Sequence, residues 1–561
     1  MSSASDKYVF EESIDQQDNS VLFQDKKWTY ITDSQNGNYN GQIQFDLNTL
    51  SSQSQWVSLR DSVIQVPLKL SIKNTSPASP TPVLTANVIN ELACAIKNGH
   101  YQFIDSIQIS ISGNTVQNSQ IYTNIDTTYK IISTWDQNTL QKYGDALGIS
   151  LDDYLGTTDT ALGSTDSLDN AALSATGTNG FDLTYSKNPG FKARQLFNNN
   201  GVLTTNLGKS ILAGNQADIG KSNVQVGNAA TVTAGGDIFV MYLVGNIRLR
   251  DISDFAANMP LCKNLKGYLY VNYNSSTHTL TKANGAATST QSTTLTTSNT
   301  ADFGRCAPAV VNVGTDGFAF GATAVGTYTF KAEVGSSASA TLTDARPILT
   351  NSRLLCPYYI ANPTIDKALT QSNKTFRYNE RFVTQFSLDR NGSINTTLTA
   401  GITNPTRIIL YPYFTNAGSS GNTSFIANPL ISPYDGVPAT TSPFAALQNL
   451  QFYVGNRPIY QSPLFYDFDN FLQEISTQGI DGGENNEVSS GLLSMRQWNQ
   501  LYRYYTVNIS RRLHPSEDGC SKSIQVSCTN STSCDMSVIA IIWYEKEVSI
   551  DTASGMIEQK R

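Results

Sequence analysis

The feature that most constrains the fold of this chain is a segment that occurs twice. Residues 104–134, IDSIQISISGNTVQNSQIYTNIDTTYKIIST, match residues 447–477, LQNLQFYVGNRPIYQSPLFYDFDNFLQEIST, with the same offset at both ends. Each copy runs from alternating apolar residues through a Gly-Asn pair, which supplies the positive φ of a tight turn, to a short helical pattern. We predict two copies of one β-rich module, and the alternative is a chance likeness between two β-hairpins.

The matched positions of the repeat share their chemistry. Ile107, Ile109 and Ile111 correspond to Leu450, Phe452 and Val454, Gly113-Asn114 to Gly455-Asn456, Ile121 and Tyr122 to Leu464 and Phe465, Asp126 to Asp469, and Ser133-Thr134 to Ser476-Thr477.

Strand patterns occur along the whole chain. Residues 62–72, SVIQVPLKLSI, alternate with period two, and Pro67 predicts a sheet edge or a bulge there because proline has no N–H to donate. Residues 381–398 predict a hairpin around Asn391-Gly392, and Gly326–Val334 predicts one more strand. Residues 538–544 are apolar on both faces, so we expect this late strand inside a packed structure.

Helical patterns are few and short. Residues 124–135, 467–476 and 489–505 are the candidates, and Asp126 or Asp467 could cap a first turn. Two long polar stretches, residues 156–180 and 275–300, predict exposed excursions, with room for hairpins of their own.

The composition favours a mostly β protein, and the charge argues against a dedicated nucleic-acid binder. Charged residues make up only 15% of the chain, against roughly 25% in typical soluble domains, and 27 Tyr and 23 Phe suit pleated surfaces. The net charge is −7, and the basic clusters at residues 510–514 and at the terminal QKR are best explained as solvated surface. The scattered, odd set of seven Cys, together with a polar start of the chain, predicts reduced thiols in an intracellular context.

Signals for catalysis or metal binding are weak, and we predict no catalytic, cofactor or metal site. The three histidines, His100, His278 and His514, form no metal-ligand spacing, and Cys520, Cys528 and Cys534 have no nearby histidine beyond His514. The carboxylate pairs are Asp152-Asp153 and Asp467 with Asp469, and a β-sandwich glycoside hydrolase would need only two such groups.

Several blocks of the chain resemble the double jelly-roll major capsid proteins of small and mid-sized eukaryotic DNA viruses, a group that includes virophages, polinton-like viruses and adintoviruses. The resemblance lies in residues 56–72, 103–116, 121–135 and 245–274 of the first half. In the second half it lies in residues 404–414, 432–462, 504–513 and the closing SIDTASG of residues 549–555.

The resemblance implies an all-β fold of two tandem jelly-roll sandwiches with few short helices. The expected parts are an N-terminal polar arm (1–27), a first roll (28–345) with long insertions near 156–240 and 275–345, and a second roll (346–561). In that reading the strand at residues 538–544 is inserted between earlier strands, so folding of the second roll waits for the complete chain.

The function that the resemblance implies is that of a major capsid protein in an icosahedral virion. It would assemble as a homotrimer whose six rolls imitate a hexamer, with the polar excursions at residues 156–180 and 275–300 as outward towers. The implied partners are neighbouring capsomers, vertex (penton) proteins and minor or cement proteins, without a specific nucleic-acid site, after assembly inside the host cell. The alternatives are an attachment or adhesin-like binding protein and the glycoside hydrolase, whereas a single-roll vertex protein is disfavoured by the repeat.

Overall fold

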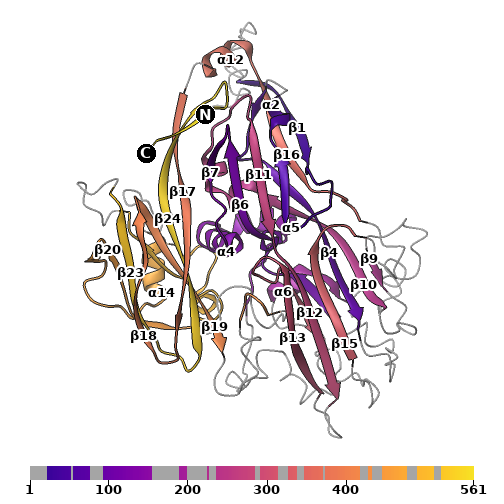
Figure 1. The fold of residues 1–561 in the computed structure, drawn as a ribbon, viewed down its shortest axis with the longest axis vertical. Helices are drawn as coiled ribbons and strands as arrows, with labels where there is room; N and C mark the ends of the chain where they lie inside the picture. The colour runs from indigo at the N-terminus through magenta and orange to yellow at the C-terminus, as the bar shows by residue number, and fades with distance from the viewer. Residues whose placement is uncertain are drawn as a thin grey trace.

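The computed structural model describes most of the chain. The described residues are 22–51, 55–75, 92–153, 189–198, 224–226, 236–284, 291–313, 326–337, 347–370, 373–416, 428–432, 445–476, 489–510 and 520–560. Figure 1 shows two β-sandwiches side by side, with their long strands running roughly along the longest axis of the molecule.

The first sandwich is built from eight strands that pair in nested order. They are β1 (Phe23–Thr32), β2 (Gln42–Asp46), β4 (Val63–Asn74), β6 (Ile104–Ile111), β7 (Asn114–Gln117), β10 (Asp237–Arg248), β11 (Gly267–Tyr273) and β16 (Arg353–Ala361). β1 pairs with β16, β2 with β11, β4 with β10 and β6 with β7, all antiparallel. The first strand therefore meets the eighth, the second the seventh, and so on inward, which is the winding of a jelly roll.

The second sandwich repeats this winding strand for strand. Its strands are β17 (Asn373–Leu388), β18 (Ser393–Ile402), β19 (Pro405–Asn416), β20 (Leu447–Val454), β21 (Arg457–Pro458), β22 (Tyr505–Asn508), β23 (Lys522–Asn530) and β24 (Asp535–Asp551). β17 pairs with β24, β18 with β23, β19 with β22 and β20 with β21. The chain is thus a double jelly roll, and the predicted all-β fold class is confirmed.

The sequence repeat falls on equivalent parts of the two rolls. In each roll it supplies the fourth and fifth strands and the helix that follows, α4 (Thr123–Thr134) in the first and α14 (Phe468–Ile475) in the second. The turn between the two strands has positive φ in both copies, at Gly113 and at Gly455-Asn456. The likeness of the two segments is therefore structural as well as sequential.

The first roll carries additional strands between its main ones. β5 (Leu92–Ile96), β8 (Gln195–Asn198) and β14 (Ala309–Val313) form a separate three-stranded sheet. β12 (Ser275–Asn284), β13 (Gln291–Phe303) and β15 (Gly326–Val334) extend the sheet of β4, β9 (Val224–Val226) pairs with β10, and β3 (Trp56–Val57) pairs with β16.

Two expectations about the insertions have different outcomes. The predicted strand at Gly326–Val334 is confirmed as β15. The polar stretch 275–300 lies mostly in the paired strands β12 and β13, a hairpin built into the large sheet. The hairpin for which this excursion had room is therefore present, and threonine favours such strands. Its start is not exposed, because Ser275, Ser276 and His278 are buried. The stretch 156–180 lies outside the described residues.

Two predictions about strand pairing are wrong. Pro67 lies at neither an edge nor a bulge, because β4 is a central strand with β10 on one side. On the other side its partner changes from β16 at residues 63–65 to β15 at residues 68–74, and Pro67 sits at this change. The Pro67 carbonyl accepts a hydrogen bond from the Gly335 N–H on that side. An N–H at position 67 would face the same side, where the partner strand changes, so proline costs no ladder hydrogen bond here.

The turn at Asn391-Gly392 exists but makes no hairpin. Asn391 has φ 53°, and the Gly392 N–H donates to the Asp389 carbonyl, as in a tight turn. The flanking strands then diverge, since β17 joins the sheet of β24 and β18 joins the facing sheet of β23. Alternation reveals which face of a strand is buried but not which strand pairs with it.

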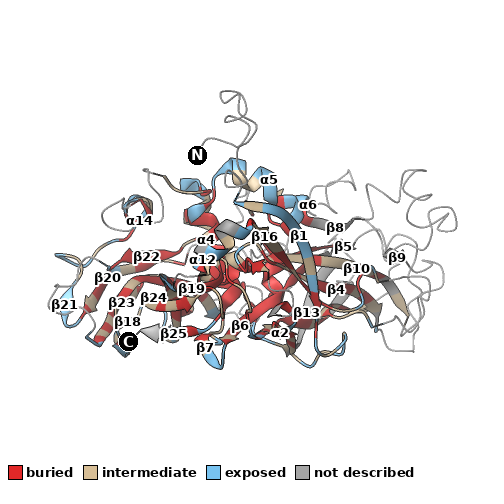
Figure 2. Cartoon of the chain, turned by 90° about the horizontal axis from the view of Figure 1, so that it is seen from above, coloured by how far each residue is buried: buried red, intermediate tan, exposed pale blue. Residues whose placement is uncertain are grey.

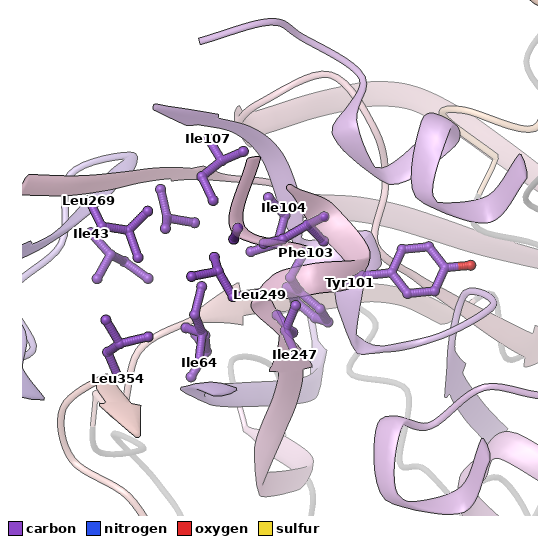
Figure 3. Packing of buried hydrophobic residues seen from close by; sticks show 14 of the residues in the cluster. Ile43, Ile64, Tyr101, Phe103, Ile104, Ile107, Ile247, Leu249, Leu269 and Leu354 are labelled. Carbon is purple, nitrogen blue, oxygen red and sulfur yellow. The ribbon is translucent and has the colours of Figure 1, made fainter. Parts of the chain in front are cut away.

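The core of the first roll lies between its two facing sheets. Figure 3 shows Ile43, Ile107 and Leu269 from the sheet of β2, β6 and β11 packed toward Ile64, Ile247 and Leu354 from the sheet of β4, β10 and β16. In the second roll, β24 lies between β17 and β19, and its residues 536–543 are buried. The expected position of the last apolar strand, inside a sheet with both faces covered, is confirmed.

The helices are short, as predicted, with differences at their ends. α14 is capped by Asp467 as expected, but the N-cap residue of α4 is Tyr122, not Asp126. The candidate at residues 489–505 is helical only in α15 (Met495–Gln500), which Ser494 caps. α5 (Gln137–Leu147), capped by Asp136, was not predicted. The remaining elements are α2 (Asn48–Ser51), η2 (His100–Phe103), α6 (Pro189–Arg194), α10 (Leu249–Ile252), α11 (Asp254–Asn258), α12 (Pro363–Leu369) and β25 (Ile557–Lys560).

The expected limits of the rolls can be compared with the strands. β1 begins at Phe23, inside the stretch 1–27 expected as an arm. β16 lies beyond the expected boundary at residues 345 and 346, yet it pairs with β1 and β4 of the first roll. Among the described residues no helix has the length and apolar character required to span a membrane.

Candidate functional site: the junction between the two rolls

The contact between the two rolls is centred on α4. This helix belongs to the first roll but lies between the two sandwiches (Figures 1 and 2), and nearly all of its residues are buried. Ile131 packs into the core of the first roll, whereas Ile125, Tyr129 and Ile132 pack into the core of the second. The apolar residues of α4 are thus divided between two cores, and the second roll covers the side of the helix that the first leaves open.

Asp126 in the first turn of α4 is held by three side chains. Its Oδ1 accepts a hydrogen bond of 2.7 Å from Trp543 Nε1 of β24, and its Oδ2 lies 3.3 Å from Arg381 Nη1 of β17. Lys130 Nζ, one turn further along α4, lies 3.2 Å from the same oxygen. The Asp126 side chain is 1% exposed and that of Arg381 6%, so the ion pair is buried within the junction.

A second buried carboxylate lies beside the first. Glu380 of β17 accepts a hydrogen bond of 2.8 Å from the backbone N–H of Asn118, which belongs to the first roll. Its other oxygen accepts one of 2.9 Å from the Tyr544 hydroxyl and forms an ion pair with Lys546. Burial, followed by the neighbouring Glu380 charge, raises the pKa of Tyr544, which keeps this phenol protonated as a donor.

Arg407 and Tyr129 extend the polar part of the junction. The Tyr129 hydroxyl donates to Thr506 Oγ1 at 2.9 Å, and Arg407 Nη1 donates to the same oxygen at 3.0 Å. Buried polar groups cost free energy unless they are paired, so this network is favourable in only one relative placement of the rolls. It fixes the orientation of one roll against the other.

The segment 428–432 forms a further contact between the rolls. Lys97 of the first roll donates from Nζ to the Pro429 carbonyl at 2.7 Å, and the Ala307 N–H donates to the Leu430 carbonyl at 2.7 Å. The Lys97 side chain is fully buried, and this burial lowers its pKa to about 7, although nearby Cys306 and Asp152 favour the charged form.

The end of the chain returns to the first roll. Val548, Ile550 and Ile557, from β24 and β25, belong to the core cluster of the first roll. Ser112 Oγ donates to the Gly555 carbonyl at 3.1 Å, and Asn114 Nδ2 donates to the Ile557 carbonyl at 3.0 Å. The last strand therefore contributes to both cores.

The carboxylate pairs noted in the sequence have structural partners. Asp152 Oδ1 lies 2.6 Å from Arg194 Nη2, and Asp153 Oδ2 lies 2.5 Å from Arg496 Nη2. Asp467 caps α14 through the Asn470 N–H at 3.0 Å, whereas Asp469 is exposed in the first turn of that helix.

The histidines and cysteines are mostly buried where the structure describes them. Burial lowers the pKa of His100 to about 4 and that of His278 to about 3, so both are neutral at pH 7. His514 lies outside the described residues. All seven cysteines are free thiols, and only Cys520 is exposed. Within the described ranges, no group of three or more His, Cys, Asp or Glu is arranged for a metal ion.

An open cavity of about 910 Å³ lies in the first roll, away from the junction. Tyr39, Tyr273 and Phe303 line it together with Lys331 and Glu333. No sequence pattern predicts this cavity, because its lining comes from five separate parts of the chain.

Comparison with known proteins places this geometry among solved structures. No family model and no curated protein matches the chain. The mavirus major capsid protein is 11% identical, with a TM-score of 0.46 over 95% of this chain and 90% of the other. A structure of the Sputnik virophage is 12% identical, with a TM-score of 0.45 over 96% and 89%. The Faustovirus major capsid protein is 10% identical, with a TM-score of 0.41 over 97% and 94%. By its own strand order this chain is a double jelly roll, and these viral shell structures are what it is similar to.

Proposed function

We propose that this protein is a major capsid protein that assembles as a homotrimer and tiles an icosahedral virion shell. The observation that carries the proposal is the duplication itself, two jelly rolls of identical winding held side by side in one chain. Three such chains in a ring present six similar sandwiches, which gives hexagonal tiles from a threefold assembly. The sequence blocks that resemble double jelly-roll capsid proteins support the same reading.

The proposal divides the chain between β16 and β17, at residues 362–372, rather than at residue 346. The first roll then includes β16, which closes its sheet, and the second roll starts with β17. The partners are neighbouring capsomers, vertex proteins and minor or cement proteins, and the protein has a structural role in the virion after assembly in the host cell.

The test is the state of the purified full-length protein. We expect analytical ultracentrifugation to give a trimer at micromolar concentration and negative-stain images to show particles with pseudo-hexagonal outline. An obligate trimer of this kind buries more than about 2,000 Å² per interface, so it should persist on dilution to nanomolar concentration. A stable, monodisperse monomer across this range would overturn the proposal.

A further inference from the structure

The two equivalent helices of the repeat are covered to very different extents. Tyr122, just before α4, is 7% exposed, but its counterpart Phe465 before α14 is 65% exposed. Asp126 is 1% exposed, but its counterpart Asp469 is an exposed residue. The second roll covers the first turn of α4, whereas α14 is buried at Phe471, Glu474 and Ile475 and its first turn is left exposed by the described elements. The start of α14 is therefore an exposed surface of the second roll, whereas the equivalent start of α4 in the first roll is buried.

One sheet of the second roll, which contains β17, β24 and β19, packs against α4. Residues of neighbouring strands in that sheet form a row, in which Arg381 of β17 lies opposite Trp543 of β24, and Trp543 opposite Arg407 of β19. Each of the three reaches α4, the first two at Asp126 and the third at Tyr129. This row is the docking surface for the helix.

The corresponding row of the first roll can be located from the backbone. In the second roll the Ile509 N–H donates to the Thr406 carbonyl, and in the first roll the Leu249 N–H donates to the Ser62 carbonyl, at the same point of the third and sixth strands. Arg407 therefore corresponds to Val63. Across the sheet, Val63 lies opposite Leu355 of β16, and Leu355 opposite Tyr30 of β1.

Leu355 and Val63 of this row are only partly exposed, but at its β1 end the row is exposed and aromatic among the described residues. Tyr30, which stands where Arg381 stands in the second roll, is 58% exposed, and Trp28 on the same face of β1 is 54% exposed. The Arg353 guanidinium lies 5.3 Å from the Tyr30 ring centroid, and Lys26 Nζ lies 5.4 Å from that of Trp28. Exposed aromatic side chains beside arginine are typical of binding surfaces. β1 is also the edge strand of its sheet, and native proteins seldom leave such edges open.

The two uncovered surfaces have complementary charge. The start of α14 presents Asp467 and Asp469, and its last turn contains no basic residue. The β1–β16 face presents Lys26 and Arg353. In Figure 2, α14 lies far from β1, so one chain cannot bring its own two surfaces together.

We propose that α14 of one copy docks on the β1–β16 face of a second copy, as α4 docks on the sheet of β17 and β24 within one chain. Asp469 then approaches Tyr30 and Arg353 of the neighbour, and Phe465 packs beside Trp28. The inference rests on the proposed function and specifies which surfaces join the subunits. Since the contact is head-to-tail, its repetition closes a ring when the rotation divides the circle, and three chains complete it.

A charge exchange tests the contact. Asp469→Arg and Arg353→Asp each place like charges face to face, and we expect each to raise the protein concentration at which half the chains are trimeric at least about tenfold. The double variant restores opposite charges and should return to within about threefold of the wild type. Asp145→Arg, at an exposed position on α5 outside both surfaces, is the matched control and should leave trimer formation unchanged.

The readout is sedimentation velocity over a concentration series, repeated in graded urea below the unfolding transition so that a tight trimer also dissociates. Thermal unfolding of each variant shows whether its fold is intact. A wild-type trimer that neither single variant weakens, or singles that the double variant fails to rescue, would overturn the docking contact and leave the capsid proposal standing. A monomeric wild type would instead overturn the capsid proposal.

Discussion

Asp126 and Asp469 are equivalent residues in opposite surroundings, which makes them a natural pair for mutation. Asp126→Ala leaves the Arg381 guanidinium buried without its carboxylate and removes the acceptor of Trp543 Nε1. We expect a loss of about 3–5 kcal/mol in the free energy of unfolding, measured by urea denaturation. Asp469→Ala, on the surface, should change it by less than about 0.5 kcal/mol when unfolding is followed at urea concentrations at which the trimer has already dissociated. Equal effects of the two substitutions would contradict the buried ion pair.

Lys97 predicts a particular pH dependence of stability. Burial lowers its pKa from 10.5 to about 7, so between these values the unfolded chain binds more protons than the folded one. Stability therefore rises with pH through this window, and the cost of the buried charge is fully present below pH 7. We expect Lys97→Met to remove this rise.

The measurement is the melting temperature of the wild type and of Lys97→Met at pH 6.5 and pH 8.5. Between these two pH values the melting temperature of the wild type should rise more than that of the variant. Higher pH is avoided because burial also raises the pKa of thiols such as Cys262 to about 12, which lowers stability once thiols of the unfolded chain ionise. An identical pH response of the two proteins would show that Lys97 is not held in a desolvated site.

At this scale the sequence predicted the residues of the repeat but not their roles. Asp126 was recognised as a helix residue able to cap a turn, yet its function is to bind Trp543, which lies 417 positions further along the chain. Nothing local distinguishes it from Asp469. The pairing with Arg381 depends on how the rolls meet, and that is a property of the tertiary structure alone.

Among the elements, the connection before α15 is closely fitted to α4. Gly491 has φ +63°, and a Cβ there would lie 2.1 Å from the Ile132 carbonyl oxygen. Gly113, in the turn of the repeat, has φ +83° with nothing within 4 Å of such a Cβ. Gly113→Ala should therefore cost only the left-handed strain of about 1–2 kcal/mol, whereas Gly491→Ala should cost distinctly more.

Urea denaturation of both glycine variants checks this ranking. The two substitutions carry the same change in the unfolded chain, so their difference reports the folded state alone. A Gly491→Ala variant as stable as Gly113→Ala would mean that the chain before α15 does not rest on the end of α4.

Elements were predicted more successfully than their pairings. Period-two alternation found the strands at residues 62–72 and 107–111 and the final strand, because burial of one or both faces is written into the order of residues. It failed at Asn391-Gly392, where the strands belong to facing sheets. At residues 275–300 a hairpin was allowed for, but its place in the large sheet beside β15 was not predicted. α5 was missed although Asp136 and Gly148 flank it as caps.

For the whole molecule, the order of the strands along the chain has consequences for folding. β24 separates β17 from β19, which would otherwise share no partner, and its far end enters the core of the first roll. A chain that ends at residue 534 should therefore fail to form the second sandwich. We expect limited proteolysis to digest residues 373–534 of this variant while the full-length protein resists.

A chain that ends at residue 556 is the control. It keeps β24 but loses β25, whose Ile557 is buried, so it should be somewhat less stable while its second sandwich still resists the protease. A resistant second sandwich in the chain that ends at residue 534 would contradict the central place of β24.

The tandem architecture was predictable from the repeat, but the junction was not, because the repeat says that the modules are alike and not how they touch. The structure adds that the last strand belongs to both modules. Loss of β24 therefore removes core residues from both rolls, Val548 and Ile550 from the first and residues 536–543 from the second. One strand in this way couples the stabilities of the two rolls, so that damage to it weakens both.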